Sequence, residues 1–275
     1  MNTKPDIRVI AMDMDCTLLT SEKTISPVTV EALKKAQEKG VYITLCTGRL
    51  ESHGVVIAAD AGLTCGAIGS NGCSVWDYRT RSVVRERCMK PEDAALVRRI
   101  TDRYPNVVYD IHGRGRVTNS VGSHSILEKF GDTLQNDFGI YYGVGRQDVD
   151  DALQNPVYKY FLHKFVSPEQ REEVRRALEQ IPGIYVTASG PKNLEIMPRG
   201  VDKGTGIADL SDYLGIGPEN VMVFGDFDND MAMFLKAGYP VAMGNGTEEI
   251  KNAAFYVTDT NDNDGIAKAV EKFVL

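Results

Sequence analysis

The chain has few cysteines, and their arrangement is not that of a cross-linked or zinc-binding protein. Its 275 residues include five cysteines, an odd number, and none of them stands in a Cys-x-x-Cys pair. A disulfide framework normally needs an even set, and structural zinc sites usually need paired ligands, so the pattern argues against both. We therefore expect a protein of a reducing compartment, with cytoplasmic localisation.

Long apolar segments and clusters of basic residues are also missing. No run approaches the ~20 apolar residues that a membrane-spanning helix needs, and no signal-peptide core precedes the first predicted strand. The formal net charge is −7. Nucleic-acid-binding proteins neutralise phosphates with Lys and Arg, so this charge argues against that class. The expected partner is a small molecule, not a nucleic acid or a membrane, and the oligomeric state is not indicated.

What the chain does have is a pair of carboxylates directly after an apolar strand. Residues 9–12 are apolar, and Asp13 and Asp15 follow one residue apart. Carboxylates at the end of a buried strand are costly unless their charge is used, and a divalent cation or a phosphoryl group would use it. Taken alone, the pair is also compatible with an ordinary strand-end turn or a helix cap.

Three further segments carry polar groups of the same kind. Residues 41–46 form an apolar strand that ends in Thr47-Gly48-Arg49, and residues 221–224 form another that ends in Gly225-Asp226-Phe227-Asp228-Asn229-Asp230. Lys203 opens an amphipathic stretch that runs to residue 214. Separately, these segments are a common loop tripeptide, a helix N-cap and a solvated lysine. Ligands of open α/β sheets bind at the carboxyl ends of strands, so together the segments can converge on one crevice.

In this order the four motifs resemble those of the haloacid dehalogenase (HAD) superfamily. The long segment between the second and third motifs is most similar to its Cof-like sugar-phosphatase branch. One position departs from the family pattern: Cys16 stands where the family usually has Gly, which we interpret as a variation in the turn. The resemblance implies a Mg²⁺-dependent phosphatase that acts on a small phosphorylated metabolite, here expected to be a sugar phosphate, through an aspartyl-phosphate.

The resemblance and the chemistry of the residues together assign roles. Asp13 would be the nucleophile, and Asp15 would be the general acid and base. Mg²⁺ would be bound by Asp13, the backbone carbonyl of Asp15 and Asp226, all oxygen donors. The phosphate would contact the backbone N–H of Met14 and the residues Thr47, Gly48, Lys203 and Asn229. Supporting or further contacts are expected from Asp230, Arg49, Asn71 and Asn193.

The predicted architecture is α/β. A doubly wound, mostly parallel, Rossmann-like core would be built from residues 1–83 and 191–275, and an inserted α+β cap domain from residues 84–190. The strand near residues 194–197 is placed at the start of the second core segment. Substrate choice would lie in the cap, where residues 113–150 show no clear pattern of elements.

Three alternatives remain open. A phosphomutase on the same scaffold would use the same aspartates, and a bisphosphate activator would distinguish it from a phosphatase. A non-catalytic regulator that binds a metabolite is a second alternative, although Asp13 and Lys203 are both present. A thiol nucleophile, Cys16 or Cys46, is the third, because both cysteines follow or end the strands near the proposed site.

Overall fold

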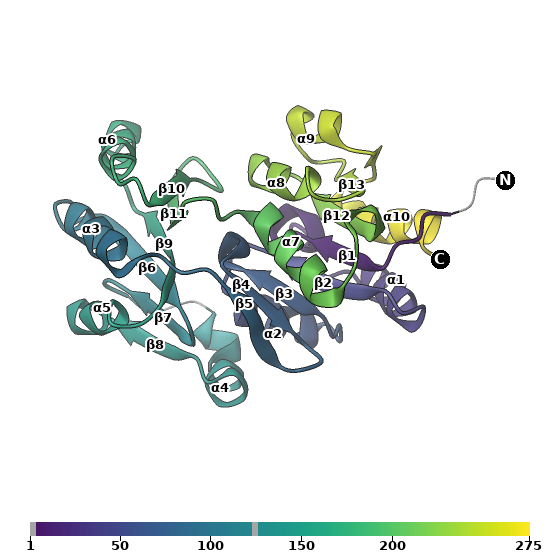
Figure 1. Cartoon of the computed structure of the whole chain (residues 1–275), viewed down its shortest axis with the longest axis horizontal. Coiled ribbons are helices and arrows are strands. Elements are labelled where there is room, and N and C mark those ends of the chain that lie inside the picture. The colour runs from purple at the N-terminus through teal and green to yellow at the C-terminus, as the bar shows by residue number, and fades with distance from the viewer. Residues whose placement is uncertain (1–3, 123–125) are drawn as a thin grey trace. The chain divides into compact units, whose positions relative to one another are not determined.

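The computed structural model describes residues 4–122 and 126–275, which fold into two compact units (Figure 1). The first unit combines the chain up to Glu86 with Asp202–Leu275, and the second is Arg87–Val201. Among the described residues, no helix is long and apolar enough to cross a membrane.

The first unit is built on an eight-stranded sheet with the order β14-β13-β12-β1-β2-β3-β4-β5. The six strands from β14 to β3 are parallel, whereas β4 and β5 form an antiparallel hairpin at one edge. The strands are β1 (Val9–Met12), β2 (Tyr42–Cys46), β3 (Gly66–Gly69), β4 (Ser74–Asp77), β5 (Ser82–Glu86), β12 (Val221–Gly225), β13 (Tyr239–Ala242) and β14 (Tyr256–Val257).

The direction of winding reverses between β1 and β12. From β1 the chain proceeds outward through β2 and β3, whereas from β12 it proceeds the opposite way through β13 and β14. Right-handed crossovers then place the connecting helices of the two halves on opposite faces, as in a doubly wound sheet. The prediction of this fold class is confirmed. The helices are α1 (Pro27–Glu38), α2 (Glu51–Asp60), α7 (Lys203–Leu214), α8 (Met231–Phe234), α9 (Glu248–Ala253) and α10 (Gly265–Phe273).

Alternate side chains of the central strands are buried on opposite faces of the sheet. Val9 and Ala11 of β1 belong to a buried cluster with Ile207 and Leu210 of α7. Ile10 and Met12 alternate with them, so they point to the opposite face, and they are equally buried, as expected for a strand covered on both sides.

Local sequence fixes where α7 begins. The side chain of Asp202 accepts a hydrogen bond from the N–H of Thr205 at 2.8 Å, and the Thr205 hydroxyl accepts one from the N–H of Asp202 at 2.9 Å. This reciprocal cap satisfies N–H groups that the first helical turn leaves unpaired. It therefore fixes the position of Lys203, the first residue of the helix.

The second unit contains a six-stranded, mostly antiparallel sheet with the order β10-β11-β9-β6-β7-β8. Its apolar face packs against helices through a cluster that includes Val97, Val174, Tyr160 and Ile196. On the other face, Lys159 and Glu195 of neighbouring strands form a buried ion pair with an Nζ–Oε2 distance of 2.8 Å. The elements are β6 (Val108–Gly113), β7 (Arg116–Asn119), β8 (Tyr141–Val144), β9 (Val157–His163), β10 (Ile184–Thr187), β11 (Leu194–Pro198), α3 (Pro91–Thr101), α4 (Leu127–Phe138), α5 (Arg146–Ala152) and α6 (Pro168–Leu178).

The predicted boundary at residue 190 differs from the observed one at residue 201. The strand expected to resume the core, β11, instead pairs antiparallel with β10 and β9 in the second sheet. A short apolar strand fits either sheet equally well, so its own residues do not identify its neighbours. The first unit accordingly resumes only at Asp202.

Both junctions of the second unit leave the first unit at the same edge of its sheet. Because β4 is antiparallel to β3 and β5 is antiparallel to β4, β5 runs in the direction of the parallel strands and ends with them at Glu86. The chain re-enters at Asp202, directly before Lys203. Ligands of doubly wound sheets bind at this carboxyl edge, so the chain leaves and re-enters the first unit at the edge of the sheet where a site is expected.

Candidate active site

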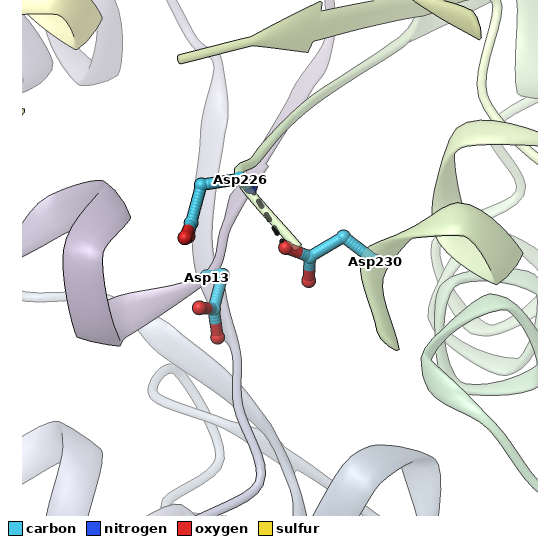
Figure 2. A group of neighbouring side chains, drawn as sticks. All are labelled: Asp13, Asp226 and Asp230. Atoms are coloured by element: carbon cyan, nitrogen blue, oxygen red, sulfur yellow. Dashed lines mark hydrogen bonds between the residues drawn. The ribbon is translucent and has the colours of Figure 1, made fainter. Parts of the chain in front are cut away.

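Three aspartates meet where the winding of the first sheet reverses. Asp13 follows β1 and Asp226 follows β12, the two adjacent strands at the switch point, and the N–H of Asp13 donates to the carbonyl of Phe224 at 3.0 Å. Asp230 ends the short helical turn that follows Asp226. One ligand oxygen from each of the three carboxylates lies within 4.8 Å of the others (Figure 2). Crevices of this kind are the usual ligand sites of doubly wound sheets.

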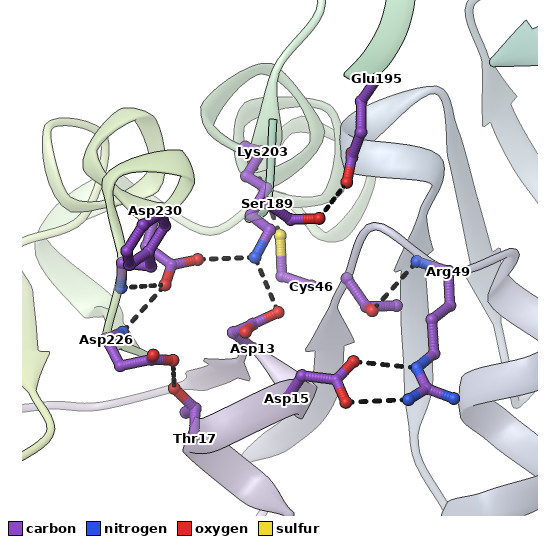
Figure 3. Close-up of polar contacts among 12 residues, drawn as sticks. Asp13, Asp15, Thr17, Cys46, Arg49, Ser189, Glu195, Lys203, Asp226 and Asp230 are labelled. Carbon is purple, nitrogen blue, oxygen red and sulfur yellow. Dashed lines mark hydrogen bonds and ion pairs between the residues drawn. The ribbon is translucent and has the colours of Figure 1, made fainter. Parts of the chain in front are cut away.

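Lys203 connects two of these carboxylates. Its Nζ lies 2.7 Å from Oδ1 of Asp13 and 2.6 Å from Oδ1 of Asp230 (Figure 3). The side chain is almost completely buried, with 1% exposed. Burial alone would lower the pKa of Lys203, but the two carboxylates outweigh it and raise this pKa above its ordinary value. Lys203 is therefore a permanently charged ammonium beside Asp13.

Asp230 organises the loop that carries Asp226. Its Oδ2 accepts hydrogen bonds from the N–H groups of Asp226 at 2.9 Å and Phe227 at 3.1 Å, while Oδ1 accepts from Lys203. Gly225 is required by this close packing, because a Cβ there would lie 2.6 Å from the Cβ of Asp230. With three donors on its two oxygens, Asp230 is best suited to support the site, the role predicted for it.

The electrostatics of the cluster fit a hard divalent cation. Burial, together with repulsion from Asp230 and Asp226, raises the pKa of Asp13 to about 7 despite the attraction of Lys203. Burial and the Asp230 charge likewise raise the pKa of Asp226 to about 6. A cation would relieve this repulsion, and an all-carboxylate donor set suits Mg²⁺ better than Zn²⁺. Among the described residues, no other group of three or more acidic, histidine or cysteine side chains is arranged in this way.

Asp15 points to a different partner. Arg49 holds it with two hydrogen bonds, from Nε at 3.0 Å and from Nη2 at 2.8 Å (Figure 3). Nζ of Lys23 lies 3.3 Å from Oδ1 of Asp15. Burial by itself raises the pKa of Asp15, but the bonds and charge of Arg49, assisted by Lys23, leave this pKa below its ordinary value. Asp15 is thus ionised in this arrangement, which suits a base.

A hydrogen bond joins the loops that follow β2 and β3. The N–H of Asn71 donates to the carbonyl of Thr47 at 2.9 Å, and the N–H of Arg49 donates to the Thr47 hydroxyl at 3.1 Å. Asn71 adopts the left-handed conformation, with φ of 57°. Gly48 lies between Thr47 and Arg49 in the same loop. These two hydrogen-bonded loops therefore carry four of the candidate residues, Thr47, Gly48, Arg49 and Asn71. Their contact with a phosphate remains a prediction.

The remaining candidates occupy three different places. Met14 is the buried first residue of the turn that follows Asp13, and Asn229 lies in the turn between Asp226 and Asp230. Asn193 belongs to the second unit, where its Oδ1 accepts a hydrogen bond from the N–H of Ser189 at 3.1 Å. The roles of these residues remain predictions.

One contact at the site goes beyond the sequence-based assignment. The hydroxyl of Thr17 donates to Oδ1 of Asp226 at 2.6 Å, so it orients a predicted metal ligand. Such support of a ligand by an outer hydrogen bond is common at metal sites. The sequence does carry a signal for it, because Thr17 completes the pattern Asp-x-Asp-x-Thr, but the pattern alone does not indicate which residue the hydroxyl contacts.

Neither cysteine near the site is activated. Burial raises the pKa of the Cys46 thiol far above its ordinary value, and burial and the charge of Asp226 also raise the pKa of the Cys16 thiol. A nucleophilic cysteine needs a lowered pKa, because the thiolate is the reactive form. The carboxylate of Asp13 is thus the better candidate.

Comparison with known proteins agrees with this site. Residues 10–270 match the family model of the haloacid dehalogenase-like hydrolases. A 5-amino-6-(5-phospho-D-ribitylamino)uracil phosphatase from Bacillus subtilis is 32% identical over 98% of this chain and 97% of its own.

Solved structures lead to the same family. A haloacid dehalogenase-like hydrolase from Bacteroides thetaiotaomicron superposes with a TM-score of 0.81 at 26% identity, covering 97% of this chain and 99% of the other. The HAD subclass IIB sugar phosphatase BT4131 superposes with a TM-score of 0.78 at 27% identity, covering 97% of this chain and 98% of the other. The chain belongs to the haloacid dehalogenase-like hydrolase family, in its Cof-type branch, and is a phosphatase.

Proposed function

We propose that the protein is a Mg²⁺-dependent phosphatase that hydrolyses a phosphate ester of a sugar or a sugar-alcohol chain through an aspartyl-phosphate on Asp13. The observation that carries this proposal is the buried carboxylate of Asp13, held by Lys203 at 2.7 Å beside Asp226 and Asp230 at the carboxyl ends of two parallel strands. At one point of the molecule, the nucleophile Asp13 is fixed in place, Lys203 supplies a positive charge for the phosphoryl oxygens, and the carboxylates supply ligands for a metal ion.

In the first step, a carboxylate oxygen of Asp13 would attack phosphorus while the ester P–O bond breaks. Lys203 already occupies Oδ1, and within the described residues no hydrogen bond is made to Oδ2. Lys203 would orient the carboxylate and offset the negative charge that develops on the phosphoryl oxygens. Asp13, Asp226 and the backbone carbonyl of Asp15 would hold Mg²⁺, which supplies positive charge against the repulsion between a carboxylate and a phosphate dianion.

Asp15 would move the protons of both steps. It would give a proton to the departing alkoxide, and then take one from the water that attacks the phosphorus of the aspartyl-phosphate and releases inorganic phosphate. The ionised pair with Arg49 fits the second task. For the first task Asp15 must leave Arg49 and carry a proton, so we infer that substrate binding separates the pair.

Replacement of Asp15 by Asn should harm poor leaving groups most. An alkoxide needs a proton in order to leave, whereas p-nitrophenolate does not, so hydrolysis of a sugar phosphate should fall roughly 10²–10⁴-fold. With p-nitrophenyl phosphate, a burst of nitrophenol followed by slow turnover is expected, because the aspartyl-phosphate still lacks its base. Rapid-quench kinetics on both substrates measures this.

A purely structural role for Asp15 predicts a different result. If the side chain only shaped the turn, both substrates would lose activity equally and no burst would occur. That outcome would remove Asp15 from proton transfer.

Mg²⁺ should stabilise the protein more at about pH 8 than at about pH 5. The pKa of Asp13 is raised to about 7 and that of Asp226 to about 6. These two carboxyl groups therefore contribute to the stability of the metal-free fold at low pH, and their contribution is lost as the pH rises through these values. At low pH, Mg²⁺ must also displace the bound protons. Melting curves with and without MgCl₂ should show a shift that grows with pH, and an equal shift at both pH values would contradict the proposed ligands.

The substrate class rests on two relatives. One is named for a phosphate on a ribityl chain, and the other is titled a sugar phosphatase. A panel of hexose, pentose and ribityl phosphates, nucleotides and p-nitrophenyl phosphate, assayed with Mg²⁺, tests this choice. A preference for the polyhydroxylated esters is expected. Transfer of phosphate to a second sugar, dependent on a bisphosphate, would instead indicate a phosphomutase.

A further inference from the structure

Two asparagines from the C-terminal part of the chain bind the backbone of the turn that carries Asp15. Nδ2 of Asn245 donates to the carbonyl of Cys16 at 2.8 Å, and Nδ2 of Asn261 donates to the carbonyl of Leu19 at 2.9 Å. The two asparagines are also joined, because the N–H of Asn261 donates to Oδ1 of Asn245 at 3.1 Å. These bonds settle the amide orientation of Asn245, since its Nδ2 faces an acceptor and its Oδ1 faces a donor.

The turn needs such support because of its conformation. Cys16 lies in the left-handed region, with φ of 62° and ψ of 6°, while Asp15 directly before it is extended. A residue with a Cβ is disfavoured there and keeps this conformation only where surrounding contacts impose it. Glycine would adopt it at little cost. The bond from Asn245 falls on the carbonyl of this same residue.

A second contact holds the far side of the turn. The carboxylate of Asp262 accepts hydrogen bonds from the N–H of Ser21 at 2.7 Å and from its hydroxyl at 2.6 Å. Asp262 follows Asn261 in the short helical segment Asn261–Asn263. The turn is thus held at residues 16, 19 and 21 by two segments that are more than two hundred positions away in the sequence.

We propose that Asn245 and Asn261 are positioning residues of the phosphatase reaction, which hold the turn after Asp13 so that Asp15 reaches the ester oxygen and the attacking water. This inference rests on the proposed proton-transfer role of Asp15. Neither asparagine would touch the reacting atoms. Both would act through the backbone of residues 16 and 19.

The test compares Asn245→Ala and Asn261→Ala with Asn263→Ala. Asn263 is a matched control, because its Nδ2 donates to the hydroxyl of Thr260, the residue directly before the segment, and not to the turn that carries Asp15. With saturating Mg²⁺ and a sugar phosphate, kcat of the first two variants should fall about tenfold, equivalent to about 1.4 kcal/mol, while KM stays nearly constant. The phosphorylation burst with p-nitrophenyl phosphate should be much less affected, and Asn263→Ala should remain near wild type.

Replacing Cys16 provides an internal check. In a Cys16→Gly background residue 16 adopts the left-handed conformation without the steric cost of a Cβ. Asn245→Ala should therefore reduce kcat clearly less in this background than in the chain with Cys16. Equal losses in the two backgrounds would overturn the link between Asn245 and the conformation of the turn. The melting temperature of every variant is measured as well. The positioning role would be overturned if the loss of kcat were explained by a lower melting temperature alone, or if Asn263→Ala lost kcat equally.

Asp15→Asn in the same assays separates this inference from the proposed function. If that variant shows the expected dependence on the leaving group but Asn245→Ala and Asn261→Ala keep wild-type kcat, only the positioning role is wrong. If Asp15→Asn shows no such dependence, the role of Asp15 and the inference that rests on it are both wrong.

Discussion

Asp13→Asn should reduce hydrolysis to background, a loss of roughly 10⁴-fold or more. Asparagine keeps the shape of the side chain but lacks the carboxylate that would attack phosphorus. Lys203 and Asp230 would remain beside it, so the fold should survive and substrate should still bind. Steady-state kinetics, together with substrate binding measured by calorimetry, checks both parts of this expectation.

A matched control is available on α7. Asp212 lies far along the helix from Lys203, near its C-terminal end, so Asp212→Asn should have wild-type activity. Should Asp13→Asn keep a substantial fraction of its activity while the control is normal, the nucleophile would have to be sought elsewhere. Cys16→Ser would then be the next variant, although burial and nearby acidic charge raise the pKa of the Cys16 thiol.

Removal of divalent cations should abolish activity as completely as the loss of Asp13. Asp13, Asp226 and Asp230 place three carboxylates within 4.8 Å of one another, and a phosphate dianion would add more negative charge. Lys203 contributes one positive charge against them. EDTA should therefore stop turnover, and added Mg²⁺ should restore it.

Two metal controls sharpen this expectation. Zn²⁺ should substitute poorly, because the cluster offers neither histidine nor cysteine. Asp226→Asn should raise the Mg²⁺ concentration needed for half-maximal activity, whereas the control Asp212→Asn should not. Full turnover by a preparation shown to be free of metal would contradict the proposed role of the cluster.

The parallel core could be predicted from sequence because its signals are local. The apolar runs at residues 9–12, 41–46 and 221–224 correspond to β1, β2 and β12, and each is followed within a residue or two by polar residues. Buried strands need such runs, and the polar residues after parallel strands gather at the carboxyl edge of the sheet. The carboxylate cluster of Asp13 and Asp226 results from the same pattern.

Contacts between distant segments could not be predicted in this way. β11 is an apolar strand that could join either sheet, and only its partners β9 and β10 decide its place. Between residues 113 and 150, strands of four residues, β7 and β8, are too short for an alternating pattern to be evident. The pairing of Asp15 with Arg49, and the bond from Asn245 to Cys16, join residues 34 and 229 positions apart with no pattern linking them.

Phosphorylation of Asp13 during turnover is the step on which the proposed mechanism depends. The most direct measurement mixes the Mg²⁺-loaded Asp15→Asn protein with p-nitrophenyl phosphate, quenches it in acid during the burst, and maps the phosphate by mass spectrometry of peptides. We expect one phosphate on the peptide that contains Asp13, acid-stable but released by hydroxylamine, and none in the Asp13→Asn/Asp15→Asn double variant. Phosphate found on another residue, or a burst of nitrophenol with no phosphoprotein, would contradict this mechanism.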